Sequence, residues 1–263
     1  MRQAAPGYPD PGTPEDRVIK GRGTTAAQWM GWPGWAGLRV AEAAELVPPG
    51  RRLVVIASHP DDEILGAGGL LAACARAGRT LLIVAVTDGL ASHPGSTLWP
   101  EPKLADQRRA ERDQSLLTLG AEDVTVQRLG FQDGDVGRAM GPVARALAGL
   151  LTAADVVVSP WRFDGHPDHE ATGQAAARAA QAVGARHLEA PIWAWHWAVP
   201  GDARMPWSRA AVLYLGPILA QRKRAAIGCF TSQLEPDPST GAEAVLPPWV
   251  VARFRHGREV FFR

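Results

Sequence analysis

Two short segments, far apart in this chain, carry the side chains best suited to metal and acid–base chemistry. Residues 59–63 read HPDDE and residues 166–170 read HPDHE, so each segment joins imidazole groups to carboxylates. Each follows an apolar run, at residues 53–57 and 155–159, and leads into a stretch expected to be helical. The carboxyl ends of neighbouring parallel strands meet at one edge of a sheet, where ligands bind in open α/β folds. The two segments are therefore expected to share one ion.

The residue types indicate which ion and which chemistry. His59 and Asp62 are three residues apart across the expected first turn of a helix, and His169 offers a third ligand from the other segment. Two histidines and one carboxylate suit zinc with a fourth position left for water, which is the pattern of a catalytic site. Asp61 lies beside the ligand Asp62 and is the candidate base for that water. Another divalent ion in place of zinc stays open.

Each segment also has a simpler interpretation. Acidic residues in a first helical turn stabilise the helix without any ion, and a single histidine after a strand is usually structural. Pro60 and Pro167 are expected at first helical positions, where the positive end of the helix keeps nearby carboxylates ionised. Because the same pattern occurs twice, a metal site is the favoured interpretation.

The pair HPDDE and HPDH resembles the LmbE/PIG-L family of zinc-dependent de-N-acetylases, which act on N-acetylglucosamine conjugates. The resemblance runs from about residue 53 to about residue 174 and more loosely to the C-terminus. It implies zinc on His59, Asp62 and His169, general base work by Asp61, and oxyanion stabilisation or proton donation by His166.

Three further residues are candidates for substrate contact. Arg108 and Glu111 match the family's R-x-x-E pattern, in which the arginine faces the substrate, although such a pair is usually an exposed salt bridge. Asp133, in QDG, is placed like the family's sugar-binding acid, although Asp-Gly is also common in turns. Asp88 follows the expected strand at residues 80–86 and is either a residue near the site or a turn residue.

A fourth candidate lies in residues 186–197 (RHLEAPIWAWHW). The alternation there predicts a half-buried strand with Trp193, Trp195 and Trp197 on one face and His196 on the other. His196 is a candidate for contact with the substrate.

Strand and helix alternate along the chain. This order predicts a Rossmann-like three-layer α/β/α sandwich with a mostly parallel sheet and right-handed crossovers. Residues 1–23, rich in Pro, Gly and charge, are expected to form a flexible arm before a single LmbE-like deacetylase domain at residues 24–263. Residues 249–254 and 259–262 are expected to pair as a terminal hairpin. The glycines at 66–69 (GAGG) lie inside an expected helix, so they favour close packing over a nucleotide loop.

Composition narrows the function classes. A net charge of +1 and the absence of a long basic run give no argument for nucleic acid. Two cysteines do not make a disulfide framework. No apolar run of membrane-spanning length and no signal sequence are evident, so no membrane span and a cytoplasmic location are expected. The Trp-rich segments are expected to cover a sheet edge, to form a contact in a homo-oligomer, or to bind sugar.

Together these observations predict a zinc-dependent hydrolase that removes the acetyl group from an N-acetylated amino sugar (GlcNAc-type) conjugate, giving acetate and a free amine. Its partner would be a small-molecule glycoconjugate. The alternatives are an amidase acting on a thiol or antibiotic conjugate, and a non-catalytic sugar- or nucleotide-binding protein on the same fold.

Overall fold

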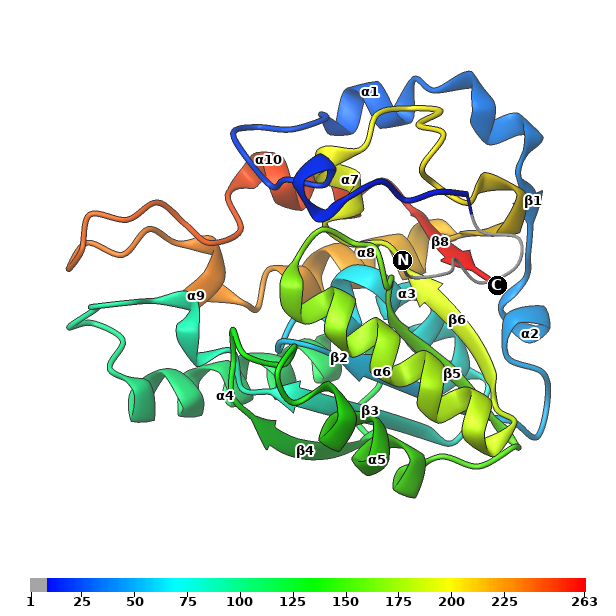
Figure 1. Ribbon diagram of the computed structural model, residues 1–263, viewed down its shortest axis with the longest axis horizontal. Coiled ribbons are helices and arrows are strands. Elements are labelled where there is room, and N and C mark those ends of the chain that lie inside the picture. Colours follow the sequence, from blue (N-terminus) through cyan, green and yellow to red (C-terminus); the bar gives the residue numbers. More distant parts are fainter. Residues whose placement is uncertain (1–8) are drawn as a thin grey trace.

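An eight-stranded sheet crosses the centre of the protein in the computed structural model, which describes residues 9–263 (Figure 1). The strand order is β1-β7-β8-β6-β5-β2-β3-β4. Strands β2 to β6 are all parallel, whereas β8 runs antiparallel to its neighbours β6 and β7. The strands are β1 (Arg39–Val40), β2 (Arg52–Ala57), β3 (Leu81–Thr87), β4 (Thr125–Phe131), β5 (Asp155–Pro160), β6 (Arg186–Ala190), β7 (Ala210–Tyr214) and β8 (Arg258–Phe262).

Helices cover both faces of this sheet. Along β2, Leu53 and Val55 pack into the core on the side of α3, while Val54 and Ile56 pack on the side of α5 and α6, which lie in front of the sheet in Figure 1. The predicted three-layer fold with a mostly parallel sheet is thus confirmed. The helices are α1 (Ala26–Met30), α2 (Ala43–Leu46), α3 (Asp62–Arg76), α4 (Glu101–Leu119), α5 (Met140–Leu150), α6 (Pro167–Val183), α7 (Ala194–Trp197), α8 (Pro217–Ile227), α9 (Thr231–Leu234) and α10 (Pro248–Val251).

The order of the strands reverses direction at β2. From β2 the chain adds β3 and then β4 on one side, and it then returns to place β5 on the other side of β2. The chain therefore passes from β2 to α3 on one face of the sheet and from β5 to α6 on the other face. Such a switch in strand order is the usual ligand-binding position of open α/β sheets.

The glycines of α3 serve close packing, as predicted. A Cβ atom on Gly66 would lie 3.2 Å from the Cβ of Ala190, and one on Gly69 would lie 2.3 Å from Leu215 Cδ2. Only a residue without a side chain lets α3 approach its neighbours this closely.

The strand predicted at residues 186–197 is wrong beyond Ala190. Strand β6 ends there, Pro191 follows, and Trp195, His196 and Trp197 lie in the short helix α7. The carboxylate of Asp164 causes the turn, because it accepts hydrogen bonds from the backbone amides of residues 192, 193 and 194 at 2.8, 2.8 and 3.0 Å. These amides cannot continue a strand ladder.

The terminal hairpin predicted from residues 249–254 and 259–262 is also wrong. Pro247 and Pro248 start α10, and a 3₁₀ turn follows at Ala252–Phe254. Proline fits the first turn of a helix and has no N–H group for a strand ladder. Strand β8 pairs instead with β7 and β6, so the last strand of the chain lies inside the sheet.

The predicted flexible arm at residues 1–23 divides into two parts. Residues 1–8 lie outside the part of the chain that the structure describes. Residues 9–24, which we call the N-terminal strap, pack against the domain: Arg17 is 3% exposed, and the Thr24 amide donates to the carbonyl of His196.

Other expectations about the chain can be compared with the described residues. Five tryptophans pack mainly on one another, with ring centroids 4.6 Å apart for Trp32 and Trp207, and Trp207 also contacts Phe262 of β8. The five are Trp29, Trp32, Trp35, Trp195 and Trp207. Cys74 and Cys229 are free thiols. Within residues 9–263, no helix has both the length and the apolar character needed to span a membrane.

Candidate metal centre and active site

The three predicted metal ligands converge at the carboxyl ends of β2 and β5. His169 Nε2 lies 3.3 Å from Asp62 Oδ1 and 3.3 Å from His59 Nδ1, and His59 Nδ1 lies 3.6 Å from Asp62 Oδ2. His59 follows β2, Asp62 begins α3, and His169 lies in the first turn of α6. The structure therefore brings together two segments that are separate in sequence.

The donor set and its charge both fit a metal ion. Two imidazole nitrogens and a carboxylate oxygen face one another within 4.8 Å, which is the ligand chemistry of a zinc site. Burial lowers the pKa of His169, but the carboxylates of Asp62 and Asp164 more than offset this and raise it to about 9. Burial likewise lowers the pKa of His59, yet the surrounding carboxylates hold it well above its ordinary value. The cluster therefore requires positive charge, which a bound cation would supply in place of protons.

Buried acids orient both histidines. The Oδ2 atom of Asp164 lies 2.8 Å from His169 Nδ1, and neither side chain is exposed. On the other ring, His59 Nε2 lies 3.0 Å from Asp133 Oδ1 and 3.4 Å from Asp168 Oδ2. An acid bonded to one ring nitrogen leaves the opposite nitrogen free to bind a metal and fixes its direction.

Two of these orienting residues were missed in the sequence. Asp164 lies in an irregular loop and contacts His169 and the turn after β6, so no local pattern indicates its role. Asp168 has the spacing of an ordinary first-turn acid, and its carboxylate accepts hydrogen bonds from the amides of Gly134 and Val136 at 2.7 and 3.2 Å. Asp168 thereby ties the loop after β4 to the metal centre.

Asp61 has the one positive φ among the non-glycine residues that the structure describes, with φ 141° and ψ −29°. Such conformations cost about 1–3 kcal/mol and occur mostly at functional sites. Burial raises the pKa of the Asp61 carboxyl to about 7, although the Arg108 guanidinium opposes the shift. A carboxyl group with a pKa near neutrality can both accept and return a proton, which suits a general base.

Arg108 contacts this base directly. Its Nη2 atom donates to Asp61 Oδ2 at 2.9 Å and to the Pro60 carbonyl at 2.6 Å, and its Nη1 atom donates to the Gly89 carbonyl at 2.9 Å. Glu111 instead accepts from the Ser232 hydroxyl at 2.7 Å, and both Arg108 and Glu111 are buried, so the usual alternative of an exposed salt bridge does not apply. The role of Arg108 in binding substrate stays a prediction, whereas its contact with Asp61 is observed.

His166 lies beside the ligands without belonging to the converging group. Its ring centroid is 5.0 Å from that of His59 and 4.9 Å from that of His169, and its Nδ1 atom accepts the Asp168 amide at 3.3 Å. Burial and the neighbouring histidines lower the pKa of His166 to about 3. The ring is therefore neutral with its proton on Nε2, which makes it a hydrogen-bond donor suited to an oxyanion.

A cavity of about 330 Å³ adjoins the cluster at Asp133. Burial raises the pKa of Asp133, but hydrogen bonds from His59 and the Ala91 amide lower it to about 2, so the carboxyl is ionised. The cavity lies between the loops that follow β3 and β4, and it is lined by Asp88, Leu90, Ala91, Glu101, Gly130, Phe131, Gln132 and Asp133. Its position and polar walls suit part of a substrate.

The remaining two candidates have structural partners. Asp88 forms an ion pair with Arg128 on β4 and contributes to the cavity wall. His196 is 4% exposed, and its Nε2 atom lies 3.0 Å from the carbonyl of Lys20 in the N-terminal strap. Contact of either residue with substrate stays a prediction.

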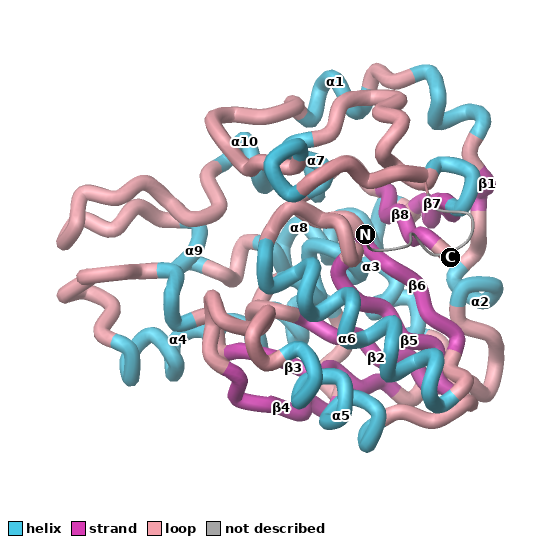
Figure 2. Tube along the Cα trace, viewed as in Figure 1, coloured by secondary structure: helices cyan, strands magenta, loops and turns pink. Residues whose placement is uncertain are grey.

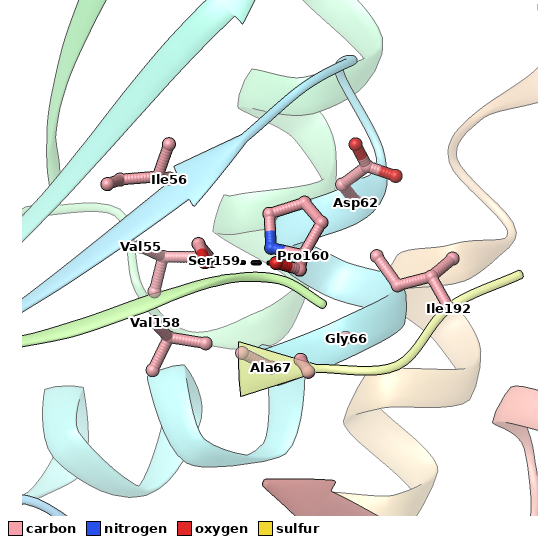
Figure 3. Close-up of a pocket in the computed structure, with 10 residues that line it drawn as sticks. Val55, Ile56, Asp62, Gly66, Ala67, Val158, Ser159, Pro160 and Ile192 are labelled. Carbon is pink, nitrogen blue, oxygen red and sulfur yellow. Dashed lines mark hydrogen bonds between the residues drawn. The ribbon is translucent and has the colours of Figure 1, made fainter. Parts of the chain in front are cut away.

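A second cavity lies behind the ligands and is too small for substrate. It measures about 10 Å³, roughly the space of one water molecule, and Figure 3 shows Asp62, Ser159, Pro160 and Ile192 around it. Of these two cavities, only the one at Asp133 has room for part of a substrate.

Two loops project near this opening. One precedes α4 and the other joins α9 to α10, and both extend from the same side of the molecule (Figure 2). They contact each other, since the Ser239 hydroxyl accepts hydrogen bonds from the amides of Thr97 and Leu98 at 3.1 and 3.3 Å.

A parallel α/β sheet that holds a His/Asp/His group and a free carboxylate at its switch in strand order defines a class of metal-dependent enzymes. Comparison with known proteins narrows this class. Residues 54–180 match the family model described as PIG-L: GlcNAc-PI de-N-acetylase. This match covers just under half of the chain and is to the PIG-L (LmbE-like) family that the two motifs predicted.

Two relatives are bacterial sugar deacetylases. The chain is 28% identical over 162 residues to 1D-myo-inositol 2-acetamido-2-deoxy-alpha-D-glucopyranoside deacetylase 2 of Catenulispora acidiphila, which covers 51% of this chain and 52% of the relative. It is 28% identical over 242 residues to the deacetylase of the same substrate name from a Nocardioides species, covering 77% and 74%. The match thus spans about half of the first relative's length.

A solved structure shares the fold. It is a deacetylase of the teicoplanin biosynthesis pathway in complex with bog, at a TM-score of 0.58 and 24% identity, covering 70% of this chain and 85% of the other.

Proposed function

We propose that this protein is a zinc-dependent hydrolase that removes the acetyl group from an N-acetylated amino sugar within a small glycoconjugate. The observation that carries the proposal is the convergence of His59 Nδ1, Asp62 and His169 Nε2 beside Asp61, whose backbone has a positive φ. The names of the two curated relatives support a GlcNAc-type substrate. The protein is proposed to be cytoplasmic and its substrate to be a small molecule.

The chain's own residues divide the chemistry among them. Zinc held by the two histidines and Asp62 would supply Lewis acidity toward the amide carbonyl and toward water. Asp61 accepts the proton of the attacking water, and Arg108 holds the Asp61 carboxylate in place. The neutral His166 donates its Nε2 proton as a hydrogen bond to the developing oxyanion. The proton taken by Asp61 then passes to the leaving nitrogen as the C–N bond breaks, so that water and amide become acetate and amine.

The cavity beside Asp133 would hold the sugar. The ionised carboxylate of Asp133 is fixed at His59 and at the Ala91 amide, and it faces a space lined by polar side chains. A carboxylate fixed in this way can accept hydrogen bonds from sugar hydroxyl groups. This arrangement would place the N-acetyl group of the sugar next to the metal ligands.

The test is release of acetate from a neutral N-acetylglucosaminyl-inositol conjugate, measured with and without a chelator. We expect the chelator to abolish acetate release and added zinc to restore it; parallel additions of cobalt and manganese rank the metals. If zinc-loaded protein released no acetate from any N-acetylamino sugar conjugate, the proposed activity would be wrong.

A further inference from the structure

The N-terminal strap (residues 9–24) crosses the loop that carries two residues of the active site. The strap lies outside residues 54–180, the region that matches the family model. The loop, residues 161–166, contains Asp164 and His166 and leads directly into His169. In Figure 1 the strap, in dark blue, runs beside α7.

Arg17 is the main anchor of the strap on this loop. Its side chain is 3% exposed, and its Nε and Nη2 atoms donate to the two carboxylate oxygens of Glu170 at 2.9 and 3.2 Å. The third guanidinium nitrogen donates to the carbonyls of residues 11, 12 and 13 at 2.8, 3.0 and 3.1 Å. A guanidinium bound bidentately and buried fixes its partner in both position and orientation.

Glu170 transmits this fixation to the active-site loop. It follows His169 in the first turn of α6, and its Oε1 atom also accepts the amide of Gly165 at 3.0 Å. Gly165 has φ +93°, and a Cβ atom there would lie 2.6 Å from the carbonyl oxygen of Arg17 and 2.7 Å from Trp197. The loop therefore packs closely against the strap at Gly165, where only glycine fits.

The other side of the same loop is held by α7. Trp197 Nε1 donates to the Asp164 carbonyl at 2.8 Å, and Arg204, whose guanidinium lies over the Trp197 ring, donates to the Asp16 carbonyl at 2.6 Å. Farther along, the strap is fixed where Arg253 Nε donates to the Thr24 carbonyl at 2.6 Å. Strap, loop and α7 thus form one hydrogen-bonded unit around the turn that carries His166 and His169.

We propose that Arg17 is a positioning residue of the metal centre: by binding Glu170 it fixes the turn from Gly165 to His169 and hence the directions of the His169 and His166 rings. The effect on turnover rests on the proposed function, whereas the effect on the turn itself does not. Groups that bond directly to a metal ligand typically change metal affinity or activity by about 10- to 100-fold when they are removed. Arg17 acts one contact farther out, so its effect should lie near the lower end of that range.

The chain offers a matched control for a purely structural effect. Arg52 Nε and Nη2 donate to the two oxygens of Asp155 at 2.9 and 2.7 Å, which is the same bidentate geometry. This pair lies at the amino ends of β2 and β5, the opposite ends of the strands that lead to the metal centre. Loss of Arg52 should lower stability without reaching the histidines.

The experiment compares Arg17→Ala, Arg17→Lys and Arg52→Ala in the full-length protein. Three properties are measured: zinc affinity by competition with a chelating dye, the visible spectrum of the cobalt-substituted protein, and hydrogen exchange of the amides at residues 164–170. For Arg17→Ala we expect zinc affinity to fall about 10-fold or more, the cobalt spectrum to change, and exchange at residues 164–170 to accelerate. Arg17→Lys should recover part of each loss, and Arg52→Ala should show none of them.

Turnover adds a fourth property. With a substrate that is deacetylated, Arg17→Ala should lower kcat and leave KM nearly unchanged, because the strap does not line the cavity.

If Arg17→Ala does not fold, Glu170→Gln serves in its place, since it keeps the size of the side chain and the bond to Gly165 but removes the charge that Arg17 binds. Unchanged exchange and zinc affinity in the folded variant, or equal losses in Arg52→Ala, would overturn the proposal. If no substrate were deacetylated, exchange, affinity and spectrum would still decide it.

Discussion

The two His-Pro-Asp segments have nearly the same sequence but divide the work of the site differently. In the first segment, His59–Asp62, the helix begins only at the fourth residue, so Asp61 occupies the N-cap with a positive φ. In the second, His166–His169, the helix begins at the second residue, so His166 is the N-cap and its backbone is in the ordinary extended region. The difference in helix start decides which side chain of each segment reaches the metal.

Equivalent positions consequently have different roles. His59 belongs to the group that could hold an ion. Its counterpart His166 accepts a backbone amide and, in the proposed mechanism, donates its remaining proton to the oxyanion. Asp61 has a strained backbone and a buried carboxyl group that Arg108 holds, whereas the carboxylate of its counterpart Asp168 orients His59. The fourth position is the one at which each segment supplies a candidate metal ligand, Asp62 in the first and His169 in the second. Two segments of similar sequence therefore differ in chemical role when their helices begin at different positions within the segment.

The largest expected effect separates the two aspartates. Asp61→Asn removes the proton acceptor while keeping the shape of the side chain, so deacetylation should fall by about 10²- to 10⁴-fold while bound zinc stays stoichiometric. Asp168→Asn should instead weaken zinc binding by about 10- to 100-fold, because His59 loses its orienting charge. Metal analysis and acetate release on both variants measure the contrast. Loss of zinc from Asp61→Asn would show that the two aspartates share one role.

The next effect separates the two leading histidines. His166→Ala should lower kcat by about 10²- to 10³-fold, as expected for removal of an oxyanion donor, with zinc content unchanged. His59→Ala should lose the metal itself, and its activity should return in part at high zinc. Zinc stoichiometry and kcat give the measurement. A His166→Ala variant that lacks zinc would place His166 among the ligands.

A smaller effect concerns the acid behind His169. Asp164→Asn should weaken zinc binding by about 10- to 100-fold, because an amide holds the His169 ring less firmly than a carboxylate does. The control is Asp155→Asn, which alters a buried acid at the amino end of β5, the strand that precedes the loop of Asp164. Chelator competition distinguishes them. Equal zinc affinities in the two variants would count against the orienting role of Asp164.

The smallest effect tests the backbone difference. The Asp61→Gly variant should have a free energy of unfolding about 1 kcal/mol higher than the Asp61→Ala variant. Both substitutions remove the carboxylate, but only glycine adopts a positive φ without strain. At position 168, within α6, the order should reverse by about 0.5–1 kcal/mol, because glycine is unfavourable inside a helix. Urea unfolding of the four variants measures both differences. Ala as stable as Gly at position 61 would mean that the first segment is unstrained.

The sequence was sufficient for the central strands and for the three residues that converge as candidate metal ligands. The strands β2, β3 and β5 are continuous apolar runs buried on both faces, and each is legible locally. The convergence of His59 and His169 follows from placing two such strands side by side. These predictions depend on patterns a few residues long and on the general rule for strand ends.

The parts that could not be predicted depend on distant partners. Pro60 was expected at the start of a helix, but its carbonyl accepts from Arg108 and the helix begins two residues later. Asp164 ends the strand after residue 190 by accepting amides that no local pattern connects to it. The residues of the N-terminal strap look like a loop by composition, and only the contact between Arg17 and Glu170 gives them a place.

Strand β8 has a consequence for how the protein loses its structure. It lies between the five parallel strands that carry the site and the small pair β1 and β7. Within the described residues, neither β1 nor β7 pairs with any of those five strands. A two-stranded ribbon is marginally stable in water. Opening of β8 should therefore release β1 and β7 in the same step, so the three strands form one cooperative unfolding unit whose amides exchange together. The amides of the parallel strands beneath the metal centre should remain protected from exchange.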